Sequence, residues 1–126
     1  MPFLVATIAY CVLLFYLSSV PSFPLSEPFK HFDKLVHFCL FGGLSATIAA
    51  GLRRARREYA YTTLFALPVG FSVLYGLSDE IHQLFVPNRT FTAADLIADA
   101  LGAIAAAALM LLLYHRRNNR RKTTAK

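Results

Sequence analysis

The chain has 126 residues, of which 56% are hydrophobic and only 16% are charged. A soluble domain usually carries about a quarter charged residues, so this composition argues against a soluble globular protein and for one that packs against lipid. The net charge is +6, but the basic residues lie beside long apolar segments. That placement is typical of loops that set membrane topology, and it excludes nucleic acid as an expected partner.

The first predicted element is a helix over residues 3–20, which is almost entirely apolar. It is long enough to cross a hydrocarbon core of about 30 Å. Small residues near its end leave a cleaved signal peptide as an alternative. No basic residue precedes the segment, however, and Pro21 and Pro24 interrupt the extended chain that a cleavage site prefers. The sequence therefore favours a retained membrane helix.

Three further membrane helices are predicted, with approximate bounds 33–52, 61–85 and 92–114. The second of these segments ends at an arginine-rich turn. The last is rich in Ala and Leu, and the hydroxyl of Thr92 can cap its N-terminus. The basic residues that follow, 116–126, are predicted to form a disordered tail.

The distribution of positive charge sets the expected orientation. Ten of the 13 Lys and Arg residues lie in the turn after the second helix and in the tail after the fourth. Loops rich in Lys and Arg stay on the cytoplasmic side. The sequence therefore predicts an all-α, four-helix transmembrane bundle over residues 1–115, with both termini in the cytoplasm and a cytoplasmic tail over 116–126.

Three of the predicted helices carry polar side chains at a similar depth. At about 1.5 Å per residue, His37, Glu80 and Asp99 lie roughly 22–28 Å from the cytoplasmic ends of their helices. Polar residues four apart share a helix face, and small residues on these faces indicate close helix contact. We expect an inward-facing polar pocket, open to the outside, lined by Asp33, His37, Asp79, Glu80, Gln83, Arg89, Asp95 and Asp99.

Some of the acidic residues of this pocket can be explained without a pocket, and others cannot. For Asp33 and Asp95, attraction to the positive end of a helix dipole is an equally good one. Asp79 and Glu80 lie near a helix C-terminus, where the dipole disfavours carboxylates, so each of them needs a partner. Arg89 is the expected partner, because its guanidinium can hold two carboxylate oxygens.

Three blocks of the chain resemble the VanZ-like family. They run from Asp33 to Phe38, from Ser78 to Arg89 and from Asp95 to Gly102. The shared patterns are D-K-x-x-H-F, S-D-E-x-x-Q-x-F-x-P-x-R and D-x-x-x-N-x-x-G, and this chain has Asp99 where the last pattern has Asn. The resemblance implies a multi-pass protein of the bacterial inner membrane, in a family linked to resistance to the glycopeptide teicoplanin.

Several functions are open at this point. The favoured one is a non-catalytic envelope protein whose pocket binds a membrane lipid, a lipid-linked envelope precursor or a partner protein, with Arg89 as the anion contact. The alternatives are an enzyme or metal site that uses His37 or Glu80, a proton-coupled transporter, and a network that only locks the bundle. No pair of side chains has a diagnostic metal-ligand spacing, so neither a metal nor a cofactor is predicted.

Overall fold

The computed structural model describes residues 2–21, 29–55 and 59–124, and the described chain is helical without strands. It contains four helices, which are α1 (Pro2–Ser18), α2 (Phe32–Arg54), α3 (Tyr61–Gln83) and α4 (Ala93–Thr124). The prediction of an all-α, four-helix fold is therefore confirmed. Helix ends lie within two residues of their predicted positions, except at the C-terminus of α4.

Three of the four helices have the length and composition of membrane spans. α2, α3 and α4 are each long and apolar enough to cross a bilayer. α1 is also apolar, but its 17 residues place it at the short end of the range of about 17–25 that a crossing takes. Large apolar side chains cover its outer surface, including Val5, Ile8 and Val12. These surfaces suit contact with acyl chains.

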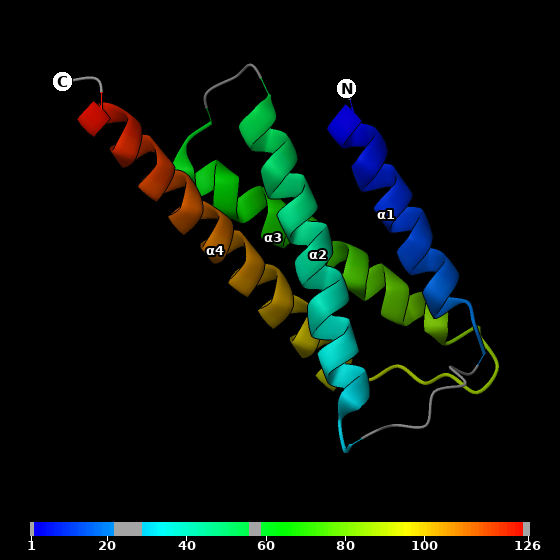
Figure 1. Cartoon of the computed structure of the whole chain (residues 1–126). Coiled ribbons are helices and arrows are strands. Elements are labelled where there is room, and N and C mark those ends of the chain that lie inside the picture. Colours follow the sequence, from blue (N-terminus) through cyan, green and yellow to red (C-terminus); the bar gives the residue numbers. More distant parts are fainter. Residues whose placement is uncertain (1, 22–28, 56–58, 125–126) are drawn as a thin grey trace.

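The helices form a bundle in which α2 and α4 make the most extensive contact (Figure 1). α3 packs against both of them, whereas α1 packs on α2 and touches α3 over a smaller area. The chain termini lie at the same end of the bundle, where α2 and α4 also end. We call this the basic end, and we call the opposite end, where α2 and α4 begin, the polar end.

Glycine sets the close approach of α2 and α4. A Cβ atom added at Gly102 would lie 2.1 Å from the carbonyl oxygen of Phe38, and one added at Gly42 would lie 3.1 Å from the carbonyl oxygen of Gly102. One turn further along, the Ser45 hydroxyl donates a hydrogen bond of 2.9 Å to the carbonyl oxygen of Ala103. Small residues thus let the two backbones touch, as in other membrane helix pairs.

A small apolar core and two tyrosines hold α1 against the bundle. Leu14 of α1 is buried in a cluster with residues of α2, among them Phe41 and Leu44. The Tyr75 hydroxyl donates a hydrogen bond of 2.6 Å to the Cys11 carbonyl oxygen, and the Tyr10 hydroxyl donates one of 3.0 Å to an α2 carbonyl oxygen. α1 is therefore a packed part of the bundle.

The C-terminal segment differs from its prediction. α4 continues without interruption to Thr124, so the prediction of a disordered tail is wrong for residues 116–124. The segment lacks Gly and Pro, and Arg and Lys are good helix formers. Positive side chains near a helix C-terminus also interact favourably with the helix dipole. The last two residues, 125–126, lie outside the described part of the chain.

Candidate functional site

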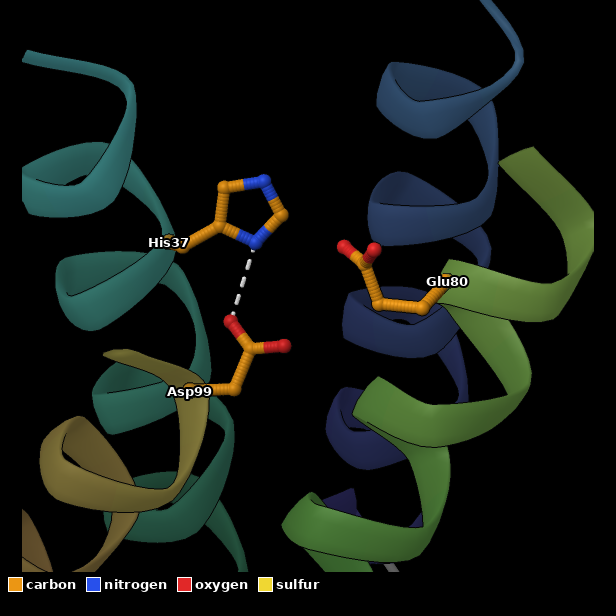
Figure 2. Close-up of side chains that lie close together, drawn as sticks. All are labelled: His37, Glu80 and Asp99. Carbon is orange, nitrogen blue, oxygen red and sulfur yellow. Dashed lines mark hydrogen bonds and ion pairs between the residues drawn. The ribbon is translucent and has the colours of Figure 1, made fainter. Parts of the chain in front are cut away.

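Three ionisable side chains from three different helices meet near the polar end. His37 comes from α2, Glu80 from α3 and Asp99 from α4, and Figure 2 shows them pointing toward one another. Each offers one nitrogen or oxygen atom, and these atoms lie within 4.8 Å of one another. Glu80 and Asp99 are completely buried, and His37 is mostly buried. We call these three residues the central cluster.

Hydrogen bonds fix the orientation of each side chain in the central cluster. Nδ1 of His37 lies 3.0 Å from Oδ1 of Asp99. A carboxylate only accepts hydrogen bonds, so Nδ1 carries a proton when Asp99 is ionised, and in a neutral His37 ring Nε2 then keeps its lone pair. The backbone N–H of Thr92 donates a hydrogen bond of 2.9 Å to Oε2 of Glu80. The start of α4 thus positions the side chain that α3 contributes.

Each carboxylate of the central cluster has one oxygen without a partner. Oε1 of Glu80 and Oδ2 of Asp99 are both buried and make no hydrogen bond within the described chain. A buried ionised oxygen without a partner is costly, because it loses its hydration and gains nothing in return. The cluster therefore has unused capacity to accept a proton or to bind a cation.

A second polar group lies beside the central cluster. The ammonium group of Lys34 forms ion pairs with Asp33, its neighbour in sequence, and with Asp95 of α4. The Thr92 hydroxyl donates a hydrogen bond to Asp95 and accepts one of 3.2 Å from its backbone N–H, so the predicted N-terminal cap of α4 is present. Side-chain exposure is 25% for Lys34 and 44% for Asp33, which places this group nearer the surface.

Asp79 and Gln83 form a local pair on α3. Nε2 of Gln83 donates a hydrogen bond of 3.1 Å to Oδ2 of Asp79, one helical turn away. Both side chains are buried. The sequence places them on one helix face, four residues apart, and the structure shows that they satisfy each other. They do not join the central cluster of His37, Glu80 and Asp99.

Arg89 has a different partner from the predicted one. Its Nε donates a hydrogen bond of 3.1 Å to the carbonyl oxygen of Val20, and its Nη2 makes a long one of 3.5 Å to the carbonyl oxygen of Leu17. Within the described residues, no ion pair joins it to Asp79 or Glu80. The predicted pairing is therefore wrong, because two carbonyl oxygens, one in the last turn of α1 and one just after it, accept hydrogen bonds from two of the guanidinium N–H groups.

The sequence of this chain matches one known protein family. The VanZ/LLP1 family profile matches residues 3–114. The chain belongs to the VanZ/LLP1 family. No curated protein and no solved structure matches the chain.

The VanZ/LLP1 match covers all eight candidate residues and leaves out residues 1–2 and the basic segment 115–126. Among those residues, the structure brings His37, Glu80 and Asp99 together and places Asp33 and Asp95 in the adjoining ion-pair group. An opening of the site to the outside stays a prediction.

Two further contacts near the site were not among the expectations from sequence. Oγ of Ser19 lies 3.1 Å from Nε2 of His82, and the backbone of Thr92 supports Glu80. The first joins residues that are 63 positions apart, and the second uses a main-chain atom. No side-chain pattern in a single sequence of a VanZ/LLP1 protein indicates either contact.

Proposed function

We propose that this member of the VanZ/LLP1 family is a multi-pass protein of the bacterial inner membrane with both termini in the cytoplasm. Support comes from the position of Arg53 and Arg54 at the basic end, together with the basic last turns of α4. Tyr61 and Tyr114 lie at the same end with ring centroids 5.9 Å apart, and Arg53 lies over the Tyr114 ring. Aromatic rings at this depth suit a membrane–water interface.

We further propose that the polar end binds the phosphate of an envelope lipid, either an anionic phospholipid or a lipid-linked precursor. The observation that carries this proposal is the state of Arg89, a guanidinium that is held by two backbone carbonyl oxygens and has no ion pair with a described carboxylate. Its remaining N–H donors match phosphate oxygens in geometry and charge.

The local backbone presents Arg89 at this end of the bundle. The turn after α3 contains Asn88, whose φ of 62° is left-handed, a conformation that Asn tolerates better than most residues. The N–H of Arg89 closes the turn with a hydrogen bond of 3.2 Å to the carbonyl oxygen of Val86. Lys34 offsets one of the two negative charges of Asp33 and Asp95 nearby, which lowers the repulsion that an approaching phosphate would meet.

The test compares lipid binding by purified wild-type protein and two variants. Arg89→Gln removes the charge and keeps an amide N–H that can still donate to the α1 carbonyl groups. Arg54→Gln makes the same change at the basic end and is the matched control. Native mass spectrometry then measures retention of phosphatidylglycerol and of a polyprenyl pyrophosphate against phosphatidylcholine.

We expect Arg89→Gln to lose the preference for the phosphate-bearing lipid and Arg54→Gln to keep it. Loss with phosphatidylglycerol alone would identify a bulk phospholipid, and loss with the pyrophosphate would identify a lipid-linked precursor. Equal retention by the wild type and Arg89→Gln, for both lipids, would refute the proposal. Equal melting temperatures would show that α1 stays docked in the variant.

A further inference from the structure

We propose that His37, Glu80 and Asp99 bind a divalent transition-metal ion, of which Zn²⁺ and Mn²⁺ fit the donor set best. One imidazole nitrogen and two carboxylate oxygens are ligand types that both ions accept. The three ligand atoms lie within 4.8 Å of one another. Donors at about 2.1 Å from a tetrahedral ion stand about 3.4 Å apart, so side-chain shifts of about 1 Å close the site.

The unpartnered oxygens are an independent reason to expect a cation. Oε1 of Glu80 and Oδ2 of Asp99 make no hydrogen bond with any described residue, although both residues have an exposure of 0%. In Figure 2 these carboxylates lie around the same space as the His37 ring. Buried groups that only accept hydrogen bonds, and that face one another without a donor between them, are stabilised by a shared positive ion.

The surrounding contacts hold the ligand atoms in place. Nδ1 of His37 and Oδ1 of Asp99 lie 3.0 Å apart, near the spacing of two ligands on one ion, so an ion can take the place of the proton between them while the ring proton moves to Nε2. The Thr92 N–H holds one oxygen of Glu80 and leaves the other without a partner in the described chain. Support of this kind, in which a second group orients a ligand, is characteristic of protein metal sites.

The charge of the polar end also favours a cation. Among the described residues, with the carboxylates ionised and the histidines neutral, this region has five negative charges and three positive ones, a net charge of −2, contributed by Asp33, Asp79, Glu80, Asp95, Asp99, Lys30, Lys34 and Arg89. One divalent ion balances this charge. The negative charge is partly particular to this chain, because Asp99 stands where the VanZ-like pattern has Asn. The single, uncharged oxygen of an Asn would be a weaker ligand for such an ion than a carboxylate.

Three protein ligands would leave at least one coordination position for water or another oxygen ligand. A phosphate oxygen of the proposed lipid would be suitable for this position. The metal site does not depend on that function, however, since it rests on His37, Glu80 and Asp99, whereas lipid binding rests on Arg89. The two proposals therefore need separate tests.

The experiment measures metal bound to the purified full-length protein in detergent. Wild-type protein is compared with His37→Gln, Glu80→Gln and Asp99→Asn, each of which removes one ligand while nearly preserving size. Asp79→Asn is the matched control, because Asp79 is a buried carboxylate on α3 that pairs with Gln83 outside the central cluster. Bound Zn²⁺ and Mn²⁺ are quantified by mass spectrometry, and affinities are measured by titration with each metal.

We expect about one ion per wild-type chain and at least a tenfold loss of affinity in each ligand variant, with a much smaller loss in Asp79→Asn, which removes a nearby charge but no ligand. A wild-type protein that takes up neither metal would refute the proposal, as would equal binding by the wild type and all three ligand variants. The first result would mean that protons neutralise the carboxylates. The second would mean an adventitious ion only.

A spectroscopic measurement covers the case in which a ligand variant fails to fold. Electron paramagnetic resonance of the Mn²⁺-loaded wild type should show coupling to an imidazole nitrogen, because His37 is in the proposed ligand set. Absence of that coupling would refute the site without any variant. Arg89→Gln should bind metal like the wild type. Its lipid preference therefore tests the lipid proposal without testing the metal site. Metal binding by the three ligand variants tests the metal site without testing the lipid proposal.

Discussion

Replacing Gly102 with alanine tests whether direct backbone contact between α2 and α4 holds the central cluster together. The added Cβ would lie 2.1 Å from the Phe38 carbonyl oxygen and 2.8 Å from its carbon. Ordinary contact begins at 3.4 Å, which leaves a shortfall of about 1.3 Å on the oxygen. Both atoms belong to the backbone, so no side-chain rotation can relieve the clash and the helices must separate.

The expected cost follows from that displacement. Overpacking of a tight contact usually destabilises a protein by about 1–3 kcal/mol. The same separation would stretch the hydrogen bond of 3.0 Å between His37 and Asp99 to about 4 Å, beyond hydrogen-bond distance. We therefore expect Gly102→Ala to unfold at a temperature several degrees lower and to lose affinity for metal as well.

The matched control is Gly70→Ala on α3. A Cβ added at Gly70 meets nothing within 4 Å, and alanine is a better helix former than glycine by about 1 kcal/mol, so this variant should be as stable as the wild type or more so. Thermal unfolding of both variants in one detergent, followed by circular dichroism, makes the comparison. If Gly102→Ala unfolds at the same temperature as Gly70→Ala, the direct contact does not set the helix separation.

Three further predictions concern hydrogen bonds and topology. Ser45→Ala should lower the free energy of unfolding by about 0.5–1.5 kcal/mol, because it removes a hydrogen bond between α2 and α4. Ser72→Ala should be neutral or stabilising, because the Ser72 hydroxyl is buried without a partner among the described residues. Equal losses of stability in denaturant titrations would contradict this prediction. Tyr75→Phe removes the bond to the Cys11 carbonyl, so a maleimide should label Cys11 faster in a Cys39→Ser background, and an unchanged rate would mean that α1 is held by packing alone. A reporter protein that is active only in the cytoplasm should be active when it is fused to either terminus. Activity at only one of the two termini would overturn the proposed orientation.

Much of the fold could be predicted from the sequence because apolar length and charge placement have direct physical meaning in a membrane. Counting residues along each helix places His37, Glu80 and Asp99 at a similar depth, and the structure brings them together. The pairing of Asp79 with Gln83 follows from their spacing of one helical turn. These features depend on local helix geometry, which a single sequence contains.

The partner of Arg89 could not be predicted in this way. Acidic residues nearby in sequence were the obvious candidates, but α1 packs so that the carbonyl oxygens of Leu17 and Val20, at and just beyond its end, lie against the guanidinium. That outcome depends on how α1 packs on its neighbours, about 70 residues away in the chain. The extent of α4 was missed for a different reason, since a basic segment without helix breakers satisfies the criteria for a disordered tail and for a helix equally well.

The length of α4 has a mechanical consequence. Its 32 residues measure about 48 Å, some 18 Å more than the hydrocarbon core, so its last turns project from the bilayer as a stiff rod. No glycine or proline interrupts the rod between Gly102 and Thr124. The basic last turns and Asp99 of the central cluster therefore lie on one uninterrupted helix, so that a tilt of one end moves the other.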